Sequence, residues 1–266
     1  MIAACIVHGF GYGILIAMTP VVFYDLVGHD KFLQALSQLL LAIGIANLLC
    51  NFVGGSIRDV YGTYDLAYEL GIAAALLAAL GFLYFLHLLS FAAHFGVQCW
   101  VTFVAGFAMF FSVPRIMFGH LQSRMFPLYF TLTLVLSCVT LLTYVVQHPY
   151  PTMTSSEAKQ LMGMCICVIS TFVNSFYLAP EIVNAMISVF EIEKSSGVAY
   201  VIGYCDRTEL KKDPKYCEHY KRFRSVHSIS GVANVVTLIC NIMYLYHLAS
   251  ISVSLHLNHL NNAYCI

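Results

Sequence analysis

Charged side chains are scarce in this sequence of 266 residues. Asp, Glu, Lys and Arg together make up 10% of the chain, whereas hydrophobic residues make up 60%, and the mean hydropathy is +0.79. About a quarter of the residues of a soluble domain are charged, because its surface must be covered with groups that water solvates. The composition therefore excludes a water-soluble globular fold and predicts a chain surrounded mostly by lipid.

An excess of basic residues is also missing. The 13 Lys and Arg are balanced by 13 Asp and Glu, so no basic face can hold a nucleic-acid backbone. The sequence has no Ser-His-Asp arrangement, no HExxH and no paired carboxylates in a plausible context, and we expect neither an enzyme nor a cofactor or metal site. The N-terminus lacks the Lys and Arg of a signal peptide.

Long apolar runs, in contrast, are abundant. A membrane span needs about 20 apolar residues, and such runs cover residues 4–24, 32–54, 66–113, 126–146, 161–178 and 226–247. As one helix, residues 66–113 would extend about 70 Å, so we expect two spans there with a break at Phe85-Leu86-His87. The fold class predicted is all-α: a polytopic helical membrane protein of about seven spans, three followed by a four-helix bundle.

Two segments between the later spans carry local signals. Thr154-Ser155-Ser156-Glu157 predicts a capped helix start after a proline-containing turn. Beyond Pro180, apolar residues at helical spacing lie opposite Glu181 and Glu191. We interpret this stretch as an amphipathic helix at the membrane interface. The alternative is a bent extension of the sixth span, packed on its neighbours.

The first 85 residues carry several short motifs, among them Asp25-Leu26-Val27-Gly28, Arg58-Asp59 and Tyr61-Gly62-Thr63-Tyr64-Asp65. With these motifs, residues 1–85 resemble the last three spans of monocarboxylate-type transporters of the major facilitator superfamily. The proline pair of that family is missing, and Asn51 to Gly55 stand in its place. The resemblance implies a solute carrier fragment as the alternative function.

A second set of motifs follows further along the chain. It comprises Gly96-Val97-Gln98-Cys99-Trp100-Val101-Thr102-Phe103, Pro114-Arg115, Gln122-Ser123, Phe126-Pro127-Leu128-Tyr129-Phe130, Asn174, Leu178-Ala179-Pro180, Asp213-Pro214-Lys215-Tyr216, His227 and Asn234. Here residues 87–252 are similar to the transmembrane protein 205 family, although Ala179 and Glu181 depart from its usual acidic and basic residues around the proline. The resemblance implies four membrane helices and a non-enzymatic role in vesicle traffic or export, in an endomembrane or the plasma membrane.

The two resemblances divide the chain into residues 1–85 and 86–266. By the positive-inside rule, the loop with Arg115 and Arg124 and the loop with eight basic residues between Lys194 and Arg224 are both cytosolic. Seven alternating spans would then place the 25–31 connection outside, whereas the transporter resemblance requires it inside. We interpret the conflict as a transporter tail joined to a complete four-helix protein, by gene fusion or by a merged gene model.

Polar residues inside spans are candidates for a site. The candidates, including family-motif positions, are Gln98, Trp100, Pro114, Arg115, Gln122, Asn174, His227 and Asn234. The amides either line a path for a small solute or hydrogen-bond across helices, at about 0.6 kcal/mol each. We expect Arg115 to lie at the membrane edge in contact with the turn around Gln122.

A basic cluster of Lys221, Arg222 and Arg224 precedes the last span. It attracts anionic lipid, at about 1 kcal/mol per basic residue, or only determines the orientation of the chain. The expected partners are therefore the lipid bilayer and anionic lipid, and the sequence predicts no particular protein partner.

Overall fold

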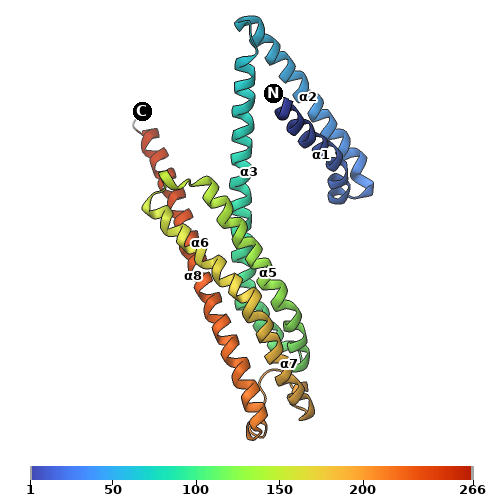
Figure 1. The fold of residues 1–266 in the computed structure, drawn as a ribbon, viewed down its shortest axis with the longest axis vertical. Helices are drawn as coiled ribbons and strands as arrows, with labels where there is room; N and C mark the ends of the chain where they lie inside the picture. Colours follow the sequence, from blue (N-terminus) through green and yellow to red (C-terminus); the bar gives the residue numbers. More distant parts are fainter. Residues whose placement is uncertain (1, 265–266) are drawn as a thin grey trace. The chain divides into compact units, whose positions relative to one another are not determined.

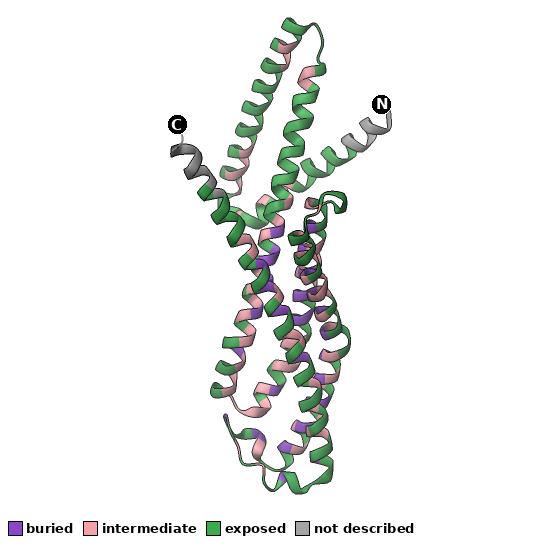
Figure 2. Ribbon diagram, turned by 90° about the vertical axis from the view of Figure 1, so that its left-hand side faces the viewer, coloured by how far each residue is buried: buried purple, intermediate pink, exposed green. Residues whose placement is uncertain are grey.

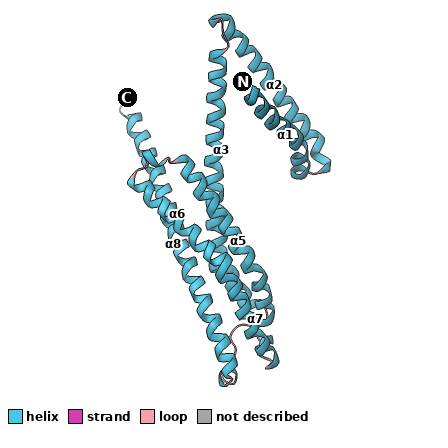
Figure 3. Cartoon of the chain, in the orientation of Figure 1, coloured by secondary structure: helices cyan, strands magenta, loops and turns pink. Residues whose placement is uncertain are grey.

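The computed structural model describes residues 2–264, and side-chain surroundings for residues 9–254, 256 and 257. Over these residues the regular elements are helical (Figures 1 and 3). They are α1 (Ile2–Val27), α2 (His29–Tyr61), α3 (Asp65–Trp100), η1 (Val101–Ala105), α4 (Gly106–Ser112), α5 (Arg115–Gln147), η2 (Tyr150–Thr152), α6 (Ser155–Val173), η3 (Asn174–Leu178), α7 (Ala179–Ser195), η4 (Val198–Tyr200), η5 (Leu210–Lys212) and α8 (Pro214–Tyr264). Apolar runs in lipid form helices because a helix hydrogen-bonds its own backbone N–H and C=O groups, and lipid offers those groups no partner.

Six helical segments of the described chain are long and apolar enough to cross a membrane. The predicted class, a polytopic helical membrane protein, is confirmed, but the expected pair of spans in residues 66–113 is wrong. Asp65–Ser112 is helical throughout, with no break at Phe85–His87. The segment has no proline or polar turn there, and His87 is 2% exposed and hydrogen-bonded inside the molecule. The topological conflict depended on a count of seven spans. With six candidate spans in the described chain, that conflict does not arise.

Contacts divide the chain into two compact units, Met1–Ala78 and Ala79–Ile266. In the first unit α1 packs against α2, and none of residues 9–78 is buried. The boundary lies inside α3, seven residues before the predicted one. The different ancestry of the two parts remains a prediction.

The second unit is a bundle in which α6 and α7 pack on α8 and both also contact α5 (Figure 1). Buried residues lie on the inward faces of these helices, and the outward-facing positions are exposed (Figure 2). Three clusters of buried hydrophobic residues stabilise it: Phe91, Tyr144, Met164 and Tyr244; Tyr129, Phe130 and Ala179; and Val189, Leu210 and Tyr216. Between them the buried surface is rich in Ser, Thr, Asn and Gln, as expected where helices associate in lipid.

The stretch after Pro180 packs its apolar face on the bundle, as the second of the two interpretations expects. α6, η3 and α7 follow one another without a loop, and Ile182, Met186 and Val189 of α7 are buried against the bundle. The π-helical turn η3 precedes Pro180, which lacks the N–H that a regular helix would use there. The alternative, a packed extension of the sixth span, describes the segment.

The predicted capped start of α6 is confirmed. The Thr154 hydroxyl accepts a hydrogen bond from the Glu157 amide, and the Glu157 carboxylate accepts one from the Thr154 amide. This reciprocal pair satisfies two amide groups that the first turn of a helix leaves unpaired.

Gly119 of α5 lies directly against the Phe190 ring of α7. A Cβ at this position would lie 2.0 Å from Cε2 of Phe190. We expect Gly119→Ala to lower the free energy of unfolding by about 1–3 kcal/mol, because the ring must leave its position. Thermal unfolding in detergent micelles measures the change. Gly96→Ala, whose Cβ meets nothing within 4 Å, is the control. In a Phe190→Ala background, Gly119→Ala should cost little further stability. If Gly119→Ala costs as much there as in the parent, this explanation is wrong.

Candidate functional site

Asn234 of α8 lies at the centre of a hydrogen-bonded network, which we call the amide network: Gln98, Thr102, Tyr129, Asn234 and Asn241. Asn234 Oδ1 accepts from Tyr129 Oη (2.8 Å) and from Gln98 Nε2 (3.2 Å). Its Nδ2 donates to Thr102 Oγ1 (3.0 Å). One side chain thus joins α8 to α3, η1 and α5.

Gln98 is fully buried, at 0% exposure, and its hydrogen bonds extend the network along α8. Its Nε2 also donates to the Asn234 carbonyl (2.9 Å), and its Oε1 accepts from Asn241 Nδ2 (2.9 Å). One turn before Asn234, Ser230 Oγ donates to Asn174 Oδ1 of η3 (2.7 Å). These amides therefore hydrogen-bond across helices, which is one of the two alternatives that the sequence left open.

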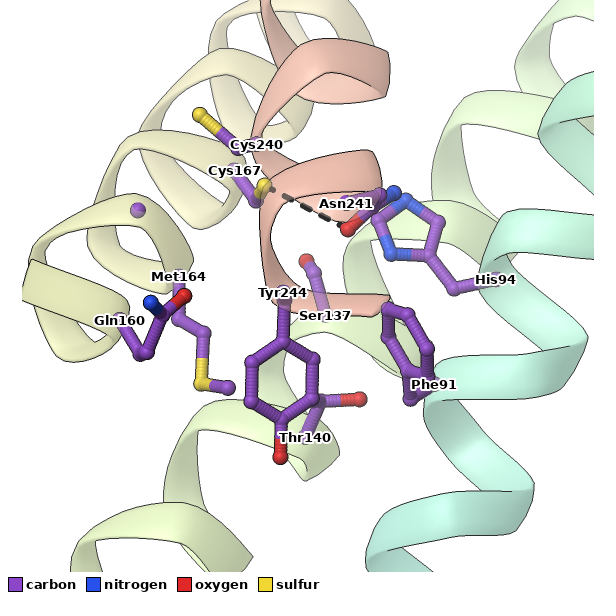
Figure 4. Close-up of a pocket in the computed structure, with 11 residues that line it drawn as sticks. Phe91, His94, Ser137, Thr140, Gln160, Met164, Cys167, Cys240, Asn241 and Tyr244 are labelled. Carbon is purple, nitrogen blue, oxygen red and sulfur yellow. Dashed lines mark hydrogen bonds between the residues drawn. The ribbon is translucent and has the colours of Figure 1, made fainter. Parts of the chain in front are cut away.

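A small pocket lies beside Asn241, lined by groups from α3, α5, α6 and α8 (Figure 4). Its volume is about 10 Å³, close to the size that holds one water molecule. His94 lines it and is 2% exposed, and its Nε2 has no hydrogen-bond partner among the described residues. Asn241, Ser137 and Thr140 bring further polar atoms to the same pocket.

We expect one ordered water molecule in this pocket, bonded to His94 Nε2, because a buried polar atom without a partner is costly. A high-resolution density map shows the water directly. His94→Leu should remove it and change the free energy of unfolding by less than about 1 kcal/mol, since no protein group loses a partner. His87→Leu is the contrast. It strips Thr143 and Tyr244 of their bonds to the His87 ring (3.0 and 2.5 Å) and should cost clearly more. A map with an empty pocket would contradict the expectation.

A buried carboxylate, Glu193 at the end of α7, gathers the groups at the opposite end of the bundle. Arg115 binds it with two nitrogens, Nε to Oε2 at 3.1 Å and Nη2 to Oε1 at 3.0 Å. Tyr216 Oη donates to Oε1 (3.0 Å), and Arg207 Nε lies 3.6 Å from the same oxygen. Glu193 is 0% exposed. We call Arg115, Glu193, Arg207 and Tyr216 the Glu193 cluster.

Arg207 connects the loop between α7 and α8 to this cluster. Its Nη1 donates to Tyr220 Oη (2.9 Å), and its guanidinium lies 5.1 Å from the centre of the Tyr220 ring. Burial by itself would lower the pKa of Arg207, but Tyr220, Tyr216, Cys205 and Glu193 together raise it. The cluster therefore holds two positive charges against one buried negative charge.

A large, partly open cavity of about 990 Å³ extends between the Glu193 cluster and the amide network. Its lining residues fall within 101–111 of η1 and α4, 115–130 of α5, 182–190 of α7 and 220–236 of α8, together with Tyr204 and Arg207. Most are Phe, Met, Val and Ile. Thr102, Tyr129 and Asn234 form a polar wall at one end, and Arg115 and Arg207 lie at the other. Tyr129 and Arg115 are 14 residues apart on α5, about 20 Å along the helix.

The predicted site residues lie in several different parts of the structure. Gln98 bonds Asn234, and Asn174 bonds Ser230 one turn earlier on α8. Arg115, Gln122 and His227 line the large cavity, where the His227 ring lies 6.1 Å from Phe126 and 5.5 Å from Phe223. Trp100 is 61% exposed and does not line the cavity. Pro114 precedes α5 and forms a β-bridge with Ile202. Lys221, Arg222 and Arg224 are exposed, with Arg222 bound to Glu181 (2.5 Å).

Instead of the expected contact with the turn around Gln122, Arg115 hydrogen-bonds Glu193 through the Nε and Nη2 edge of its guanidinium. Sequence reasoning overlooked Glu193, although a signal was present. Ile182, Met186, Val189 and Glu193 share one face of a helix at spacings of four, three and four. A carboxylate that continues an apolar face has to be paired inside the protein.

Among the residues that the structure describes, no group of three or more His, Cys, Asp or Glu side chains is placed to hold a metal ion. The cavity instead offers aromatic surface, amide and hydroxyl groups at one end and guanidinium groups at the other. Such a lining binds a molecule that is mostly apolar and carries polar groups.

These features define a polytopic helical membrane protein whose C-terminal bundle has a polar interior and a large, partly open cavity. Residues 89–190 match a family model described as a domain of unknown function (DUF4149). Transmembrane protein 205 of Danio rerio is 33% identical over 169 residues, which are 62% of this chain and 90% of that protein. The chain belongs to the transmembrane protein 205 family. No solved structure matches it. The family model does not reach residues 1–88, and the resemblance of residues 1–85 to monocarboxylate-type transporters remains a prediction.

Proposed function

We propose that this protein is a non-enzymatic membrane protein that takes an amphipathic molecule from the bilayer into the large cavity. The observation that supports it is a cavity of about 990 Å³ with a mostly aromatic and aliphatic lining, in which guanidinium groups lie at one end and the Thr102, Tyr129 and Asn234 side chains lie at the other. A water-soluble ligand would gain little from such walls. A molecule dissolved in the bilayer would exchange lipid contacts for complementary protein contacts and polar partners.

Holding such a molecule is compatible with the role in export or vesicle traffic that the family resemblance implies. We propose export of a membrane-dissolved molecule as the more direct use of a mostly apolar, partly open cavity. Solute carriage by residues 1–85 gains no comparable support, because the residues that line the two cavities described above all lie within 91–244.

Filling the cavity tests the proposal. Gly231 lines it, and a Cβ at this position meets nothing within 4 Å. Gly231→Phe therefore places a ring in the cavity without a clash at Cβ, and phenylalanine is also the better helix former. We expect the variant to fold and to lose most of the lipid or amphiphile that the parent retains through detergent purification, measured by native mass spectrometry.

Gly96→Phe is the matched control. Gly96 is also exposed and unobstructed at Cβ, but it lies outside the cavity. This variant should retain the same bound molecules as the parent. Equal retention by Gly231→Phe and the parent would contradict the proposal.

A further inference from the structure

We infer that the occupant of the large cavity is an anionic phospholipid, with its phosphate at Arg207 and Arg115 and its hydrocarbon chain along the apolar walls. This inference rests on the proposed function and names the class of ligand. Two independent features carry it: the sign of the charge that faces the cavity, and the separation of that charge from the apolar walls.

The charge facing the cavity is positive. The charged residues among its described lining are Arg115 and Arg207, and no carboxylate is part of that lining. Glu193, which binds both arginines, is completely buried behind them and does not line the cavity. Because two guanidinium groups share one carboxylate, a net positive charge remains for an incoming anion.

Arg207 also keeps hydrogen-bonding capacity. Among the described residues its Nε has no hydrogen-bond partner, since the Glu193 oxygen at 3.6 Å is too distant for a good hydrogen bond, and its Nη2 makes none either, because the one hydrogen bond of this guanidinium runs from Nη1 to Tyr220. Arginine presents five donors in a planar fork that matches phosphate oxygens. A phosphate at this end would complete the donors of Arg207 without displacing the Arg115–Glu193 pair.

The apolar part of the cavity extends from this charged end. Phe110, Phe118 and Tyr204 lie close to one another beside it, with the Phe110 ring 6.0 Å from Phe118 and 5.3 Å from Tyr204. Further along, the walls are formed by Phe126, Phe130 and aliphatic residues of α7 and α8. A headgroup at the arginines thus has its chain directed along the helices, as lipids are oriented in a leaflet.

The single tryptophan of the chain allows a direct test. Trp100→Phe combined with Phe110→Trp moves the only indole from an exposed position to the cavity wall. The full chain is reconstituted into phosphatidylcholine vesicles that contain a small, equal fraction of either brominated phosphatidylserine or brominated phosphatidylcholine. We expect the cavity tryptophan to be quenched several-fold more by the anionic lipid, whereas Trp100 in the parent is quenched equally by both.

Variants locate the headgroup. Arg207→Gln should abolish the preference for the anionic lipid, and Arg207→Lys should retain part of it. Lys221→Gln with Arg224→Gln removes charge from the exposed basic cluster and should leave the preference unchanged. If this pair abolishes the preference while Arg207→Gln does not, or if Trp100 shows the same preference, the anion binds at the surface and the inference is wrong.

The outcomes also distinguish this inference from the proposed function. Both lipids could quench the cavity tryptophan equally, with this quenching lost in Gly231→Phe. That outcome would overturn the inference of an anionic headgroup and leave the cavity a lipid site. No quenching above that of the surrounding bilayer by either lipid would overturn both.

Discussion

Glu193→Ala is expected to lower the free energy of unfolding by about 3–5 kcal/mol, because removing one partner of a buried ion pair leaves the remaining charge unpaired. Arg115 is 11% exposed in its side chain and loses three hydrogen bonds at once. Tyr216 loses its acceptor and Arg207 its nearest negative charge. Denaturant unfolding in detergent, followed by Trp100 fluorescence, measures the change.

Glu191→Ala is the matched control for this prediction. Glu191 lies two residues earlier on α7, is exposed, and should change stability by no more than about 0.5 kcal/mol. Glu193→Gln keeps the volume and one acceptor oxygen, so its cost should lie between the two alanine variants. If Glu193→Ala costs no more than Glu191→Ala, the cluster does not stabilise the end of the bundle.

Asn234→Leu is expected to cost about 2 kcal/mol or more, because buried groups that lose their partner cost about 1–3 kcal/mol each. Tyr129 and Thr102 both lose their bond to this side chain, whereas Gln98 keeps the Asn234 carbonyl as an acceptor. The effect should exceed the average of about 0.6 kcal/mol for one interhelical hydrogen bond in lipid, since one side chain serves several helices. Thermal unfolding in detergent provides the comparison.

A double-mutant cycle separates the network from a simple packing defect. Tyr129→Phe should destabilise the parent but cost almost nothing in the Asn234→Leu background, because its acceptor is already gone. Asn184→Leu, at an exposed position of α7, is the control for the change from amide to leucine. Additive costs of Tyr129→Phe and Asn234→Leu would show that the two side chains are not coupled.

Local signals account for most of the helix assignments and for one error. The Thr154–Glu157 start was predictable because a capping box involves only four neighbouring residues. The predicted break at Phe85–His87 was wrong. A lone histidine in an apolar run indicates a turn only if its side chain is exposed to water. Here His87 meets Thr143 and Tyr244, which lie 56 and 157 residues further along the chain. Nothing near His87 in the sequence reveals those partners.

The sequence by itself determined that this is an all-helical membrane protein, which segments are helical, and to which family its C-terminal part is related. These properties follow from hydropathy and short motifs, which are sums over neighbouring residues. Only the tertiary structure decided that Gln98 bonds Asn234, that Arg115 selects Glu193 rather than the Gln122 turn, and that a cavity opens between them. Several polar residues are chemically equivalent partners for each of these groups, and the rotation and contact of helices distant in the chain determine which of them meet.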